Sequence, residues 1–123
     1  MTSIIPSSDV ITRVIPATYS GVTANIYIQR SKNVCDLRIE IGNGTAAFSS
    51  ATGTDIIFEL PSDWIPSYRK EGTLVARTGG NWATETYYIA AVAIETTGNV
   101  YIRGNANNLK QCRYITGDLM YLL

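Results

Sequence analysis

The chain has 123 residues, the length of a single domain, and 46% of them are hydrophobic, which excludes a disordered chain. Ten Lys and Arg residues balance ten Asp and Glu residues, so the net charge of zero creates no field that would draw the chain to nucleic acid or to an anionic membrane. Histidine is absent, which removes the most common general base and metal ligand.

Apolar and polar residues alternate at every second position along most of the chain, whereas helical periodicity is missing. The alternating runs 24–29 and 35–41 are joined by a short polar break, which predicts a hairpin with one buried face. Further strands are expected at 56–60, 73–78, 83–96, 100–103 and 111–123, the last of them broken near Gly117. About eight short strands separated by turns predict an all-β fold, an antiparallel β-sandwich or jelly roll that forms one domain over residues 1–123, without a helix.

The run from Tyr87 to Ile94 departs from the alternation because it is apolar on both faces. A strand of a sandwich normally keeps one face in water, so the second face of this strand needs a cover. Another copy of the chain is the favoured cover and predicts a homo-oligomer; the alternative is a long loop of the same chain. Ala90, Ala91 and Ala93 are small, as expected where strands approach closely.

Cys35 and Cys112 have apolar neighbours and are expected to be buried free thiols, with a bridge between them as the alternative. No signal peptide and no apolar run long enough to cross a membrane is visible, which predicts a protein made in a cytoplasm and not inserted in a membrane.

No arrangement of residues in the sequence marks a catalytic site, although a Ser-Lys dyad stays open as an alternative. Asp36, Glu40 and Glu59 take outward strand positions, and no nucleophile elbow, phosphate-binding loop, dinucleotide fingerprint or metal-ligand cluster is present. The basic near-neighbours Arg69-Lys70 and Lys110 with Arg113 each have an acid nearby, so the signal for nucleic-acid binding is weak and such a partner is not expected. We therefore expect a protein that is not an enzyme and has no catalytic residue, metal or cofactor.

Aromatic and amide side chains in loops are the remaining candidates for a binding site. Sugars are held by aromatic rings on their C–H faces and by planar polar side chains on their hydroxyls. Trp82 follows a glycine-rich loop, where an indole is either pinned at the edge of the core or used for contact. The candidate saccharide-binding residues are Arg77, Asn81, Trp82, Glu85 and Tyr87, with Asn105 and Asn107 in a second loop. For Tyr87, the alternative to ligand binding is packing in an interface. For the asparagines, the alternative is turn formation. Trp64, between two prolines, is expected to be a packing plug in the core.

The order of motifs from residue 55 to 123 is distinctive. A segment with Leu60, Pro61, Trp64 and Pro66 precedes a strand, a glycine-rich loop, the apolar strand, the run Thr97-Gly98-Asn99-Val100-Tyr101-Ile102 and a final Tyr121-Leu122-Leu123. This order resembles the head domains of phage receptor-binding proteins, particularly those of phages that infect Gram-positive bacteria such as lactococci. The chain departs from the family pattern at Ile65, where an arginine usually precedes the second proline, and its first half matches only as generic strands.

The resemblance implies a homotrimeric head at the tail tip of a virion, which adheres to a host cell-wall polysaccharide or glycan without changing it chemically. It also implies that the chain is a fragment of a longer receptor-binding protein, whose missing N-terminal region would attach to other baseplate proteins. Family saccharide sites use Trp with acidic and amide side chains, and Trp82, Asn81, Glu85 and Arg77 match in type. Two alternatives remain open: a structural virion or baseplate module with protein partners only, and a carbohydrate-binding module of an enzyme.

Overall fold

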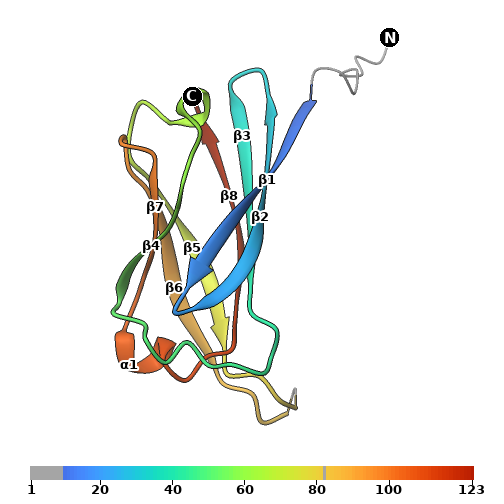
Figure 1. The fold of residues 1–123 in the computed structure, drawn as a ribbon, viewed down its shortest axis with the longest axis vertical. Helices are drawn as coiled ribbons and strands as arrows, with labels where there is room; N and C mark the ends of the chain where they lie inside the picture. The colour runs from blue at the N-terminus through green and yellow to red at the C-terminus, as the bar shows by residue number, and fades with distance from the viewer. Residues whose placement is uncertain (1–9, 82) are drawn as a thin grey trace.

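The computed structural model describes residues 10–81 and 83–123 (Figure 1). Within these residues, the eight strands are β1 (Val10–Tyr19), β2 (Val22–Ser31), β3 (Val34–Ile41), β4 (Thr54–Glu59), β5 (Lys70–Arg77), β6 (Tyr87–Ile94), β7 (Asn99–Arg103) and β8 (Tyr114–Leu122). They form one antiparallel sheet in the order β1-β2-β3-β8-β5-β6-β7-β4. The sheet curls until its two edge strands, β1 and β4, lie close together, so the shape is nearly that of a barrel. The expected all-β fold is confirmed. The expected break near Gly117 is wrong, because β8 pairs with β3 without interruption through that residue, and β1 was not among the strands expected from the sequence.

Two short helical turns depart from the expectation of an entirely non-helical chain. A 3-10 helix (Ser62–Trp64) follows β4, and a helix α1 (Ala106–Leu109) lies between β7 and β8. Alternation cannot reveal such turns, because each is only about one turn long and carries no helical period.

The hairpin expected from the alternating runs is formed by β2 and β3. Ile28 lies opposite Leu37 across the two strands, and Lys32 adopts a positive φ of 56° in the turn. This register turns Ile26, Ile28, Leu37 and Ile39 into the interior, where all four are buried. Each fully buried aliphatic side chain contributes roughly 1.5–3 kcal/mol to the free energy of unfolding.

The core closes at one end around Trp64. Its side chain is buried, and its backbone carbonyl accepts a hydrogen bond of 2.8 Å from Tyr121 Oη. The guanidinium groups of Arg13 and Arg30 lie 5.7 and 6.0 Å from the indole ring, within the range of cation–π contacts. Trp64 is therefore the packing plug that its position between two prolines predicts.

Cys35 and Cys112 are both buried and both free, so the expectation of two free thiols is confirmed and the alternative bridge is absent.

The outward face of β6 is divided into two halves. Ala93 is fully buried there, between Glu71 of β5 and Tyr101 of β7 in the strand register. Glu71 Oε1 lies 3.7 Å from Nη1 of Arg103 on β7, so an ion pair spans β6 above its small alanines. By contrast, Tyr87 and Ile89 are 48% and 72% exposed. Side chains of the same chain thus cover one half, and the half with Tyr87 and Ile89 stays open; a homo-oligomer remains a prediction for that half.

Candidate functional site

Arg77 and Glu85, two of the predicted ligand-binding residues, bind each other at the base of the β5–β6 hairpin. Arg77 Nη1 lies 3.0 Å from Glu85 Oε1, and the Glu85 side chain is only 2% exposed. The Arg77 guanidinium also lies 4.5 Å from the centre of the Tyr114 ring on β8. Both charged groups are therefore occupied in holding the hairpin against β8.

Asn81 shapes the turn of the same hairpin. Its side-chain Oδ1 accepts a hydrogen bond of 2.9 Å from the backbone N–H of Ala83, and its carbonyl accepts bonds from the N–H groups of Thr84 and Glu85. Such an Asx turn is a common local role of asparagine. Trp82, the central residue of the predicted site, lies outside the described residues.

The other three predicted residues are spread over two places. Asn105 precedes helix α1, and its Oδ1 accepts a hydrogen bond of 3.1 Å from the N–H of Asn108, which is N-cap geometry. The Asn107 carbonyl accepts a bond from Gln111 Nε2. Tyr87 lies opposite Arg77 in the strand register, with about half of its surface exposed.

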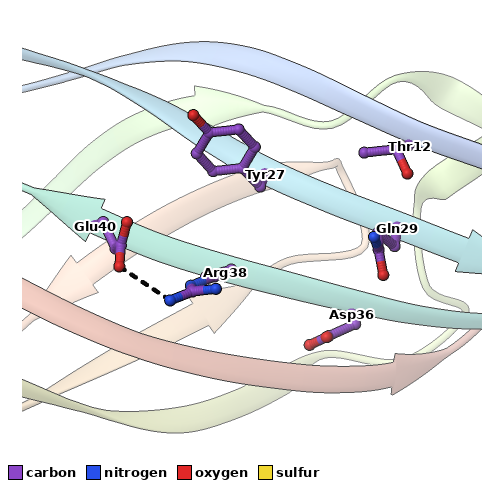
Figure 2. Close-up of a pocket in the computed structure, with 6 residues that line it drawn as sticks. All are labelled: Thr12, Tyr27, Gln29, Asp36, Arg38 and Glu40. Atoms are coloured by element: carbon purple, nitrogen blue, oxygen red, sulfur yellow. Dashed lines mark hydrogen bonds and ion pairs between the residues drawn. The ribbon is translucent and has the colours of Figure 1, made fainter.

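A hollow of about 410 Å³ lies elsewhere, on the outward face of the sheet. Figure 2 shows six side chains that project into it from three adjacent strands. They are Thr12 of β1, Tyr27 and Gln29 of β2, and Asp36, Arg38 and Glu40 of β3. None of the predicted ligand-binding residues lines this hollow.

The strand register explains why these side chains meet. Tyr27 lies opposite Arg38 across β2 and β3, and Gln29 lies opposite Asp36, while Thr12 lies opposite Gln29 across β1 and β2. Directly opposed side chains on one face of an antiparallel pair are neighbours, with their Cβ atoms about 5 Å apart. Two rows of polar and aromatic groups therefore run across the strands.

A second hollow, of about 280 Å³, adjoins the first on the side of β8. Arg38 and Glu40 line both hollows, and Thr116 and Asp118 of β8 extend the polar surface. Asp118 lies opposite Arg38 in the register, so it continues the row that begins at Tyr27. We call the two hollows together the outer groove.

The charged groups of the outer groove are loosely held. Arg38 Nη2 lies 3.2 Å from Glu40 Oε1, but both side chains are more than half exposed, so the pair is weak and free to rearrange. Among the described residues, the carboxylates of Asp36 and Asp118 form no ion pair or side-chain hydrogen bond within the chain. Tyr27 is 44% exposed and lies opposite Arg38 in the strand register. These groups are available to bond hydroxyls and to stack on an apolar face.

A third hollow, of about 530 Å³, lies on the outward face near the open half of β6. Its lining combines the polar side chains of Thr54, Thr73 and Arg103 with Ala91 and the exposed Ile89. A large exposed aliphatic side chain such as Ile89 is typical of a surface that contacts protein.

In the described part of the chain, no group of three or more Cys, Asp or Glu side chains is placed to hold a metal ion. Neither short helix among the described residues has the length or apolar character needed to cross a membrane.

Comparisons with protein families and with curated proteins found no match to this chain. The resemblance to phage head domains therefore remains a prediction from the motif order.

The outer groove was missed from the sequence, although a signal for it was present. Alternation places Tyr27, Gln29, Asp36, Arg38 and Glu40 on outward positions of two strands joined by a short turn. A short turn fixes the register, and the register pairs Tyr27 with Arg38. Each outward acid taken singly is an ordinary solvated side chain; only the paired rows indicate a site.

Proposed function

We propose that this protein is a non-catalytic saccharide-binding domain and that the outer groove is its binding site. The observation that carries the proposal is the half-exposed Tyr27 ring within a hollow lined by amide, carboxylate and guanidinium groups from neighbouring strands. This combination matches a sugar, which presents C–H faces to aromatic rings and pairs of hydroxyls to planar polar groups.

The loose pairing within the groove favours binding over a structural role. Arg38 and Glu40 gain little from each other in water, so a ligand that bonds both loses little by separating them. An aromatic contact contributes about 0.5–1.5 kcal/mol beyond the area it buries, so one domain should bind weakly. Several copies joined in one particle would convert weak sites into tight attachment.

The biological setting that we propose is the head domain of a receptor-binding protein at a phage tail tip or baseplate. Its homotrimer would adhere to the wall polysaccharide of a host bacterium. The motif order from residue 55 to 123 supports this setting, as does the all-β fold. The open half of β6, with Tyr87 and Ile89, supports association between copies.

A structural virion module with protein partners only is the second candidate. The observation that favours it is Ile89, which is 72% exposed beside the third hollow. A carbohydrate-binding module of an enzyme would be monomeric, so the mass in solution, measured by light scattering, separates that alternative from a trimeric head.

The proposed site is tested by comparing three tyrosine variants on a glycan array and by calorimetry with the best hit. Tyr27→Ala should weaken the affinity about five- to tenfold, because it removes the stacking ring. Tyr68→Ala is the matched control, since Tyr68 is 81% exposed and lines none of the three hollows, and its affinity should equal that of the parent protein. A loss of affinity in Tyr87→Ala with full binding by Tyr27→Ala would move the site to the hairpin. Absence of binding to any saccharide would overturn the proposed function.

A further inference from the structure

The outer groove is long. It begins at Thr12 on β1 and ends at Asp118 on β8, so it crosses four neighbouring strands in the sheet order. Three strand spacings amount to about 14 Å. One sugar ring would fill only part of this length, whereas a short run of linked sugars would contact both hollows.

The groove is also acidic, although the chain as a whole is neutral. Its charged side chains are the carboxylates of Asp36, Glu40 and Asp118 and the guanidinium of Arg38, so three negative charges and one positive charge leave a formal charge of −2. Arg38 pairs with Glu40 and lies opposite Asp118 in the strand register, and among the described residues neither Asp36 nor Asp118 forms an ion pair, so the single guanidinium does not balance the three carboxylates.

The surroundings do not reverse this balance. The residue opposite Asp36 on β8 is Met120, which is 66% exposed, and the residue opposite on β2 is Gln29. Arg30, the nearest basic residue along β2, points to the other face, where its guanidinium lies against Trp64 and Asp63. Arg38, two residues along the same face of β3, is therefore the one basic side chain among the described residues that lines the groove, and its guanidinium is already paired with Glu40.

We infer that the ligand of the outer groove is a stretch of several linked sugars that carries no acidic groups, either neutral or bearing amines. This inference rests on the proposed function, because it specifies the saccharide that the same groove selects. Acidic groups on a saccharide would be repelled by Asp36 and Asp118 within the screening distance of about 8 Å at physiological salt. An amine would be attracted, and a pair of neutral hydroxyls would donate hydrogen bonds to the same carboxylates.

The experiment combines a glycan array graded by charge and chain length with a variant that neutralises the groove. Asp36→Asn with Asp118→Asn keeps the shape and removes two charges. Glu59→Gln is the matched control, because Glu59 is an exposed carboxylate on β4, outside the groove. The parent protein should bind neutral or amine-bearing oligosaccharides and should bind the corresponding monosaccharide more weakly. The double variant should gain about two- to fivefold in affinity for phosphorylated analogues of the best hit, and the control should not.

Three results are decisive. Preferential binding of phosphate- or carboxylate-bearing saccharides, lost in Tyr27→Ala, would overturn the inference and leave the proposed function standing. Equal affinity for a monosaccharide and its oligomers would also overturn it, because the second hollow would then be unused. Binding to no saccharide class would overturn the proposed function itself and the inference with it.

Discussion

Two regions of the molecule carry the same kinds of polar side chain and use them differently. One is the outer groove. The other, which we call the loop end, is the end of the sheet where residues 42–53, the β5–β6 hairpin and α1 lie (Figure 1). At the loop end, Arg77 is bonded to Glu85 and Asn105 caps a helix. In the groove, Arg38 and Asp36 have weak partners or none within the described chain. Residue type alone does not distinguish the two regions; the presence or absence of an internal partner does.

Close backbone contact explains why the loop end needs internal bonds. Gly42 and Gly44 both have positive φ angles, and a Cβ atom at either position would collide with Arg113 or Tyr114. Arg113 Nη1 donates to the Gly44 carbonyl, and the Phe48 N–H donates to the carbonyl of Cys112. Loops packed this tightly must satisfy their polar groups within the chain.

The largest effect that separates the two regions is expected from arginine replacements. Arg77→Ala leaves the nearly buried Glu85 carboxylate without its partner and removes the contact with Tyr114, so the free energy of unfolding should fall by about 2–3 kcal/mol. Arg38→Ala breaks only an exposed pair and should cost less than about 0.5 kcal/mol. Urea unfolding of both variants measures the difference.

An equal loss of stability in the two arginine variants would contradict the distinction between the regions, because both ion pairs would then stabilise the fold. If Arg77→Ala is as stable as the parent and no longer binds saccharide, the site lies at the hairpin, as residue types in the sequence suggest.

Most of the fold was predictable from the sequence because the alternation of apolar and polar residues at every second position determines the strands and their buried faces. Alternation in runs 24–29 and 35–41 gives both the hairpin and its inward face, and prolines around Trp64 give the plug. The site was less predictable because it depends on which strands become neighbours. The approach of β8 to β3, which brings Asp118 beside Arg38, joins segments about 80 residues apart, and no local pattern encodes it.

The second test of the comparison is the pH dependence of stability, which a buried thiol at the loop end, Cys112, should produce. Burial raises the pKa of the Cys112 thiol from 9.0 to about 11. In the unfolded chain the thiol ionises near its ordinary pKa, while the folded protein keeps it neutral; stability is therefore full below pH 9 and falls as the pH rises from 9 towards 11. The loss attributable to this thiol should be about 1 kcal/mol at pH 10.

Chemical unfolding at a series of alkaline pH values, compared with Cys112→Ala, tests this expectation. The variant should show a shallower decline, and the part that remains is expected from Cys35, Tyr19 and Tyr121, whose pKa values burial also raises. Identical slopes in parent and variant would show that the thiol titrates no differently in the folded protein, and that this part of the loop end is more hydrated than its burial indicates.

The smallest effect concerns the two asparagines around α1, both of which were candidates for saccharide binding. Asn105→Ala removes the N-cap bond to Asn108 and should lower the free energy of unfolding by about 0.5–1 kcal/mol, at the low end of cap effects because the helix has only four residues. Asn107→Ala leaves the carbonyl that bonds Gln111 in place and should change stability by less than about 0.5 kcal/mol. Saccharide affinity should be unchanged in both variants. If either one loses affinity while keeping its stability, polar groups at the loop end serve the ligand after all, and the division between a self-bonded loop end and an available groove fails at that residue.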